Sequence, residues 1–261
     1  MLKKIGACIF LVSLTASVIG CTTEYNLATN QEETLLFGTE KEVKLGEAIS
    51  LEFDKKNKLV TDVDVNERVS QILRRIVDVC DRKELLYSIK IVDEDKVNAF
   101  SLPGGFVYVN KGLIDKIGND DELACVIGHE VGHITAKHSI KKMQSLYGYT
   151  FLKVLTVQTT HSSDMARGLD LAFASIFTEY SREDEFLADK LGIKYVKKAG
   201  YNPLAMVTFL KKLGKIQEKE PPGQFTYWRT HPYVAQRIAA VNQEISGNLE
   251  FKDYLNLMGE K

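Results

Sequence analysis

The sequence predicts an α+β fold, in which one predominantly helical domain carries a small β-sheet. Two short segments have β-type patterns, residues 87–92 and 106–110, and the apolar residues after Gly112 have helical spacing. With 261 residues, 44% of them hydrophobic and 26% charged, the composition is that of a globular protein with one large core. We therefore expect a single folded domain over residues 38–261.

The N-terminus has the pattern of a bacterial lipoprotein signal peptide over residues 1–20. Lys3 and Lys4 precede an apolar stretch that is too short to span a bilayer, and Gly20 is followed by Cys21. The residues before Cys21 resemble a lipobox, so we expect cleavage after residue 20 and a lipid on Cys21. A plain signal peptide with an incidental cysteine is the alternative.

The lipid on Cys21 is expected to hold the mature protein to a membrane of the bacterial cell envelope. Residues 21–37 are polar and lack periodicity, which predicts a flexible tether. Thr22, in place of aspartate after the cysteine, favours the outer membrane, and we expect the domain on its periplasmic face. The chain has 34 Lys and Arg against 35 Asp and Glu and no basic run, so we expect no nucleic-acid partner.

Apolar spacings of three and four residues predict most of the domain as helix. In chain order we expect helices over 39–57 and 69–80, strands over 87–92 and 106–110, and helices over 120–139, 182–199, 203–219 and 233–246, the last two separated by a break at 221–223. Asn119 with Glu122, and Ser181 with Asp184, have the spacing of a capping box at a helix start. Residues 98–105 are expected to join the two strands.

The second strand is a candidate substrate-binding edge strand, formed by Phe106, Val107, Tyr108, Val109 and Asn110. An extended peptide can pair with an exposed sheet edge through backbone hydrogen bonds, which tolerate many sequences. An ordinary sheet strand without a ligand role is the alternative.

Cys80 and Cys125 are the cysteines that remain after Cys8 leaves with the signal peptide and Cys21 takes the lipid. Both stand at apolar helical positions, where free cysteine is a common small core residue. We therefore expect free thiols more than a disulfide, although an oxidising compartment would permit one.

A metal-binding pattern, His129-Glu130-Val131-Gly132-His133, lies inside the predicted 120–139 helix. Residues four apart share one face of a helix, so both imidazoles can reach one ion with Glu130 beside them. This arrangement suits a zinc ion with two nitrogen ligands and a carboxylate that accepts a proton from water. A histidine pair on an exposed helix face is the alternative.

A catalytic zinc needs a third protein ligand, and the sequence offers several candidates. Ser139 stands where an extended motif would have a third histidine, and His138 lies well off the ligand face, so it is expected to have a structural hydrogen-bonding role. Glu185 has an aspartate, Asp189, one turn later that could bond the outer nitrogen of a ligand histidine. This partner favours Glu185 as the third ligand, and Glu183 remains the alternative.

The motifs together resemble the HtpX and CAAX prenyl endopeptidase family of zinc metallopeptidases, and in particular its soluble bacterial envelope members. They are Asn98-Ala99-Phe100 with Pro103-Gly104-Gly105, the His129 to His133 motif, Tyr180-Ser181-Arg182 through Glu185 to Asp189, and Thr230-His231-Pro232. The resemblance covers about residues 38 to 247. It implies a zincin-like domain with one zinc on His129, His133 and Glu185, Glu130 as general base, and Asp189, His231 and Arg237 near the metal. Members of that family with membrane helices or a helical-repeat domain differ from this sequence, so their substrates do not transfer.

His231 precedes Pro232 in an irregular stretch that could fold over the cleft. It could stabilise the oxyanion of the tetrahedral intermediate, or act as a reversible fourth zinc ligand, or be a loop histidine bonded to backbone. Arg237 is expected to be an orienting ion-pair partner near this region, with a solvated helix arginine as the alternative.

These observations predict a zinc-dependent endopeptidase of the bacterial cell envelope. We expect its substrates to be unfolded or misassembled envelope proteins. The alternative is a non-proteolytic chaperone or assembly factor with a structural metal site. The complete HExxH pattern favours the enzyme, because a protein that had lost catalysis would often lack Glu130.

Overall fold

The computed structural model describes residues 22–145, 168, 171–172, 174–176, 178–219 and 227–246. The predicted signal peptide, Cys21 and the break at 221–223 lie outside these ranges. In chain order the elements are β1 (Thr22–Asn26), β2 (Gln31–Leu35), α2 (Thr39–Lys56), α3 (Val63–Val77), β3 (Ser88–Val92), β4 (Ala99–Leu102), β5 (Phe106–Asn110), α4 (Lys111–Ile114), α5 (Asp120–Thr135), α8 (Arg182–Lys198), α9 (Ala205–Gln217), α10 (Tyr227–Thr230) and α11 (Val234–Ser246). The predicted α+β class with a predominantly helical domain is confirmed.

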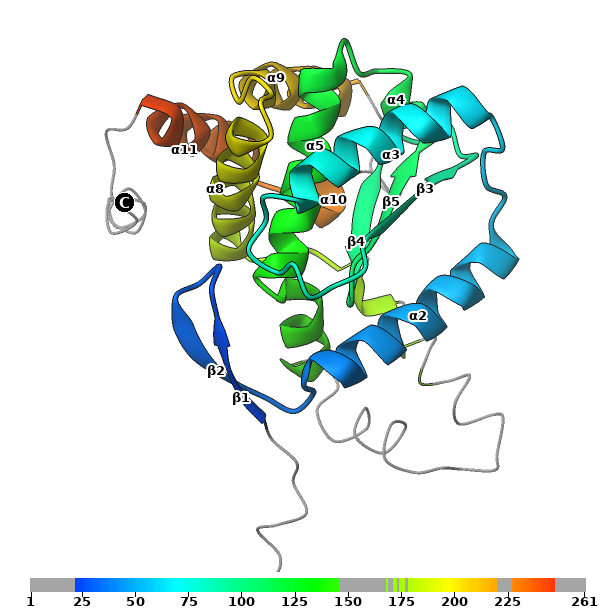
Figure 1. Ribbon diagram of the computed structural model, residues 1–261. Helices are drawn as coiled ribbons and strands as arrows, with labels where there is room; N and C mark the ends of the chain where they lie inside the picture. Colours follow the sequence, from blue (N-terminus) through cyan, green and yellow to red (C-terminus); the bar gives the residue numbers. More distant parts are fainter. Residues whose placement is uncertain are drawn as a thin grey trace, which may run out of the picture.

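A three-stranded sheet in the order β3-β5-β4 lies on one side of the central helix α5 (Figure 1). β3 runs parallel to β5, and β4 runs antiparallel to it. Successive side chains of a strand point to opposite faces, so Val107 and Val109 join the core formed with α3 and α5, while Tyr108 packs with Phe53 of α2. The sheet is therefore covered by helices on both faces.

The prediction that residues 106–110 form an edge strand is wrong. β5 is hydrogen-bonded on both sides, and the edge position next to α5 belongs to β4. Gly104 and Gly105 have φ values of 80° and 107°, which a residue with a Cβ adopts only at a cost, and they let the chain reverse between β4 and β5. The expected connection over residues 98–105 thus contains a strand of its own.

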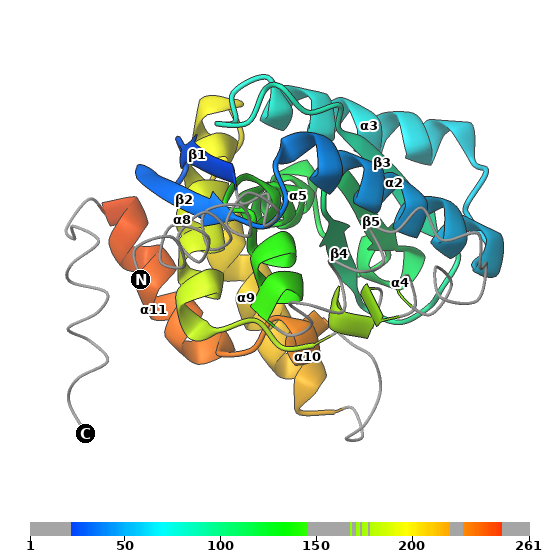
Figure 2. The same cartoon turned by 90° about the horizontal axis from the view of Figure 1, so that it is seen from below.

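The prediction of a flexible tether over residues 21–37 is also wrong for the residues that the structure describes. β1 and β2 pair antiparallel from Thr22 opposite Leu35 to Asn26 opposite Gln31, and the turn contains Asn30 at φ 53°. The hairpin lies beside the end of α5 and the start of α2 in both views (Figures 1 and 2). Its strands are mostly polar, and ion pairs of Glu24 with Lys137 and of Glu33 with Lys141 attach it to the domain, while Leu35 at the end of β2 is buried.

α5 packs mainly against α8, at the centre of the helical part (Figure 1). A Cβ on Gly132 would lie 2.7 Å from the carbonyl oxygen of Ala188, so only glycine permits this close approach. The predicted starts of both helices are confirmed, since Asn119 accepts from the Glu122 amide and Ser181 forms a capping box with Asp184. The short distance between the helices brings their polar side chains together.

The predicted end of the metal-motif helix at residue 139 is wrong. α5 ends at Thr135, Lys137 adopts φ 59°, and the chain becomes helical again over residues 138–145. This break changes the direction in which His138 points.

Cys80 and Cys125 are both free and buried, as expected for core cysteines. Among the described helices, none combines the length and the apolar character needed to cross a lipid bilayer.

Candidate metal centre

Four buried side chains bring possible metal ligands to one point between α5 and α8. His129 and His133 come from α5, Glu185 from α8, and His231 from the residue that follows α10. One nitrogen or oxygen atom from each of the four lies within 4.8 Å of the others. All four side chains are at most 1% exposed.

Three distances between atoms of the cluster are close to the separation of donor atoms around one tetrahedral zinc ion, which is roughly 3.3 Å. His129 Nε2 lies 3.0 Å from His133 Nε2 and 3.3 Å from His231 Nδ1, and His133 Nε2 lies 3.3 Å from Glu185 Oε1. Glu185 Oε2 points to the Arg237 guanidinium, whose Nη1 lies 2.8 Å away, so Oε1 is the oxygen directed at the cluster. The residues present therefore fit a zinc ion by spacing and by donor type.

Glu130 lies beside the cluster and contributes no atom to it. Both of its carboxylate oxygens are buried without a hydrogen-bond partner in the described part of the chain, and Oε1 is 3.4 Å from His231 Nε2. His231 Nε2 also lacks a hydrogen-bond partner there. Unpaired polar atoms are costly to bury, so these atoms are candidates for contact with a bound water or substrate.

Asp189 and Arg237 support His129 from the side away from the cluster. His129 Nδ1 and Asp189 Oδ1 are 2.8 Å apart, so a proton on Nδ1 leaves the lone pair of Nε2 directed at the cluster. Arg237 donates to both oxygens of Asp189, at 2.8 and 2.7 Å, and its Nη1 lies 2.8 Å from Glu185 Oε2. Arg237 is completely buried and contacts two carboxylates, so it is not a solvated helix arginine, and its orienting role stays a prediction.

The sequence of this chain matches a known family over most of its length, including all of these residues. Residues 64–245 fit the model of the family described as Peptidase family M48. The chain belongs to peptidase family M48. The resemblance drawn from its motifs is therefore confirmed, and so is the prediction of a metallopeptidase.

Named relatives of this M48 peptidase come from mitochondria and bacteria. The mitochondrial metalloendopeptidase OMA1 of Arabidopsis thaliana is 32% identical over 157 residues, which cover 60% of this chain and 31% of that protein. The beta-barrel assembly-enhancing protease of Escherichia coli is 24% identical over 224 residues, 82% of this chain and 45% of that protein. Metalloprotease YcaL of Escherichia coli is 23% identical over 257 residues, 94% of this chain and 99% of that protein. The chain thus spans less than half the length of the first two relatives.

His133 has an outer partner in this M48 peptidase that the helix geometry of the sequence did not predict. The Nδ1 atoms of His133 and His138 are 2.8 Å apart, and His138 Nε2 lies 3.4 Å from Asp184 Oδ1. The expected hydrogen-bonding role of His138 is therefore confirmed, but its partner is a ligand candidate. The reason is the end of α5 at Thr135, after which His138 no longer follows the helical angle.

Two tyrosines that the sequence analysis did not assign pack on the histidine rings. Tyr180 stacks on His133 with ring centroids 4.1 Å apart, and Tyr227 stacks on His231 at 4.4 Å. Tyr180 directly precedes the N-cap of α8, a position that could have indicated its place near Glu185. No sequence signal marked Tyr227.

Burial and neighbouring charges set the protonation states in the cluster. Burial, together with Arg237, lowers the pKa of His129 to about 3, so its imidazole is neutral near pH 7. Burial alone would raise the pKa of Glu185, but His231, Arg237 and His129 hold it well below its usual value. Burial raises the pKa of Glu130 to about 7. A neutral histidine and an ionised carboxylate are the forms that bind a metal.

The other residues that the sequence predicted for the site lie in different parts of the chain. Glu183 is exposed on α8, whereas Glu185 is buried in the cluster, so the structure favours Glu185 as the third ligand candidate. Residues 106–110 lie inside the sheet as β5. Cys21 lies outside the described residues, and its lipid stays a prediction.

Proposed function

We propose that this chain is a zinc-dependent endopeptidase that hydrolyses unfolded or misassembled proteins of the bacterial cell envelope. The observation that supports it most strongly is the buried cluster of His129, His133 and Glu185 in a chain of family M48. Beside this cluster lies Glu130, whose carboxylate oxygens have no hydrogen-bond partner within the described ranges. His129, His133 and Glu185 would hold one zinc ion, and this ion would act as a Lewis acid and lower the pKa of water toward about 7.

Glu130 is the proposed general base. Its carboxylate accepts the proton of the attacking water and passes it to the nitrogen of the leaving amine. A pKa near neutrality suits both transfers, since the same group must accept and release a proton in each turnover. His231 Nε2 lies 3.4 Å from Glu130 Oε1 and has no hydrogen-bond partner in the described part of the chain, so it would donate to the oxygen of the tetrahedral intermediate.

The proposed docking site for an extended substrate is the outer edge of β4. Asn98 accepts from the Asn110 amide, so the alternation of an antiparallel pair turns the backbone groups of Ala99 and Ser101 away from β5. No strand within the described ranges pairs with this edge, although β4 is buried and the Ser101 carbonyl accepts from the Ser139 hydroxyl at 3.4 Å. Backbone pairing there would accept many sequences, as an enzyme for unfolded proteins requires.

Zinc binding by the cluster can be tested by metal analysis of purified single variants. His129→Ala, His133→Ala and Glu185→Ala should each retain well below one zinc per chain, because each removes one of three ligands. Glu183→Ala is the matched control, since Glu183 is an exposed acidic residue two positions before Glu185. Full zinc in Glu185→Ala with loss in Glu183→Ala would show that the third ligand is assigned wrongly.

His231→Ala should lower turnover by about 10²-fold with zinc retained, because an oxyanion donor is lost. Steady-state kinetics on an unfolded protein, combined with metal analysis, measures both effects. A rise in cleavage would instead identify His231 as a ligand that holds the resting enzyme inactive. Unchanged kinetics and zinc affinity would exclude His231 from the active site.

The proposed location is the periplasmic face of a membrane, with the outer membrane favoured, through a lipid on Cys21. Cys21→Ser should block lipoprotein maturation and leave the chain uncleaved or aberrantly processed. Metabolic labelling with a fatty acid and membrane fractionation would detect the change. Mature wild-type protein without lipid in the soluble fraction would contradict the proposal.

A further inference from the structure

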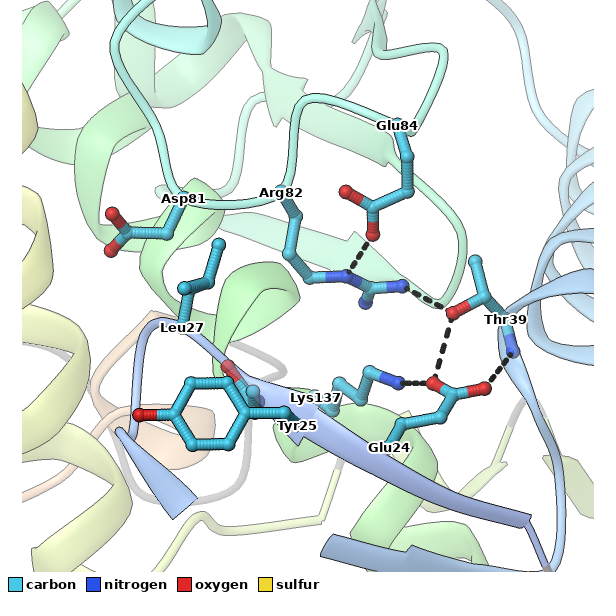
Figure 3. A pocket seen from close by; sticks show the side chains of 9 residues that line it. Glu24, Tyr25, Leu27, Thr39, Asp81, Arg82, Glu84 and Lys137 are labelled. Carbon is cyan, nitrogen blue, oxygen red and sulfur yellow. Dashed lines mark hydrogen bonds and ion pairs between the residues drawn. The ribbon is translucent and has the colours of Figure 1, made fainter. Parts of the chain in front are cut away.

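The break after α5 depends on contacts that come from the N-terminal hairpin. Lys137 adopts φ 59°, a left-handed conformation that costs a residue with a side chain roughly 1–2 kcal/mol. Its ammonium group is buried, with 4% of the side chain exposed, and pairs with Glu24 of β1 (Figure 3). Glu24 also accepts from the backbone amide and the hydroxyl of Thr39, at 3.2 and 3.1 Å. Glu24 therefore joins the start of α2 to the break.

Two more hydrogen bonds connect β2 and the residue after it to the helical segment 138–145. Lys141 donates to Glu33 of β2 at 2.6 Å, and the Leu36 amide donates to Gln144 Oε1 at 2.6 Å. A cavity of about 340 Å³ lies between the hairpin and the loop that carries Asp81 and Glu84 (Figure 3). Ile140 and Met143 anchor the segment in an apolar cluster, and the polar contacts link the hairpin side of the domain to it.

The same segment carries the side chains that hold His133. His138 bonds the outer nitrogen of His133 at 2.8 Å. Ser139 lies 2.9 Å from the hydroxyl of Tyr180, whose ring stacks on His133. His133 is thus held by the imidazole of His138 and the ring of Tyr180. His138 directly follows Lys137, and Tyr180 is bonded by the next residue, Ser139.

We propose that the N-terminal hairpin, through the Glu24–Lys137 ion pair, positions the metal ligand His133. Glu24 is a positioning residue in this inference, since it touches neither substrate nor metal. The inference rests on the proposed function, because it assigns a support to the same site. Loss of the Glu24 charge leaves a buried cation without a partner and removes the contact that holds the left-handed turn. The segment then shifts, and His138 and Tyr180 no longer hold His133 in one orientation.

The test compares Glu24→Gln with Glu32→Gln in the full-length protein. Glu32 lies on β2 of the same hairpin, is exposed, and makes no ion pair within the described residues, so it controls for loss of one charge. Two readouts are used: kcat and KM on an unfolded protein, and the absorption spectrum after replacement of zinc by Co²⁺, which reports ligand geometry. Glu24→Gln should lower kcat roughly 2- to 30-fold, the range of coupling through residues outside a site. KM should change less than kcat, because the segment reaches β4 through the Ser139 hydroxyl, 3.4 Å from the Ser101 carbonyl, whereas His138 and Tyr180 both contact His133 directly.

The same Glu24→Gln change in a protein that also carries Lys137→Gly tests whether the effect passes through Lys137. Glycine adopts φ 59° without steric cost, so in Lys137→Gly the turn no longer needs its ion pair. There Glu24→Gln should change kcat by less than about twofold. An equal loss in both backgrounds would overturn the inference, because the effect would then bypass Lys137.

Cleavage by the wild type tests the proposed function, and the comparison of variants with the wild type tests this inference. A wild-type protein that binds Co²⁺ but cleaves nothing would remove the proposed function, while the spectra of wild type, Glu24→Gln and Glu32→Gln would still decide the inference. Wild-type cleavage with kcat and the Co²⁺ spectrum unchanged in Glu24→Gln would overturn the inference and leave the proposed function intact. An unfolding midpoint measured for each variant shows whether it is folded at the assay temperature.

Discussion

Glu130→Gln is expected to lower peptide hydrolysis by about 10²- to 10⁴-fold, the range for loss of a general base. The amide has the size of the carboxylate but cannot accept a proton at neutral pH. Because Glu130 contributes no atom to the ligand cluster, the variant should keep one zinc per chain and its unfolding midpoint. Digestion of an unfolded protein, metal analysis and thermal unfolding measure the three quantities.

Glu183→Gln is the control for this variant, because Glu183 is an exposed glutamate at the start of α8 and should leave turnover unchanged. Substantial residual cleavage by Glu130→Gln would contradict the role of Glu130. The same variant also tests the chaperone alternative in cells. A phenotype that survives Glu130→Gln would show that the protein acts without proteolysis.

Arg237→Met is expected to lower the free energy of unfolding by about 3–5 kcal/mol, the cost of breaking a buried ion pair. The guanidinium bonds both oxygens of Asp189 and lies 2.8 Å from Glu185 Oε2, and all three side chains are almost completely buried. Methionine fills part of the volume but leaves two carboxylates without their counter-ion. Urea unfolding of the wild type and the variant measures the difference.

Arg68→Met is the matched control, because Arg68 pairs with Asp120 at 2.7 Å with 42% of its side chain exposed. Exposed pairs contribute about 0.2–1 kcal/mol, so its loss should be small. Equal destabilisation in the two variants would show that burial does not strengthen the Arg237 interactions. The comparison therefore separates a charge that organises the site from one on the surface.

Local patterns predicted most of the helices. The apolar spacing of α2, α8, α9 and α11 placed each of them within a few residues of its observed bounds. The caps at Asn119 and Ser181 placed the starts of α5 and α8. Such signals depend on neighbours within one or two turns, so they can be recognised without the rest of the fold.

The wrong predictions concern segments whose backbone conformation depends on residues distant in the sequence. β4 has four buried residues and no polar alternation, so no period marks it as a strand. Its pairing with β5 moved residues 106–110 from the sheet edge to the centre. The β1–β2 hairpin has polar strands and depends on ion pairs with residues 113 and 108 positions away in the chain.

The sequence by itself determined the metal motif and the candidate third ligand. His129 and His133 are four residues apart in one helix, and Glu185 and Asp189 are four apart in another, so each pair shares a helix face by local geometry alone. Only the tertiary structure decided which groups hold these ligands in place. Arg237 and His138 reach their partners through the packing of α11 on α8 and through the break at Lys137. These contacts join residues from separate elements, and their geometry exists only once those elements are packed together.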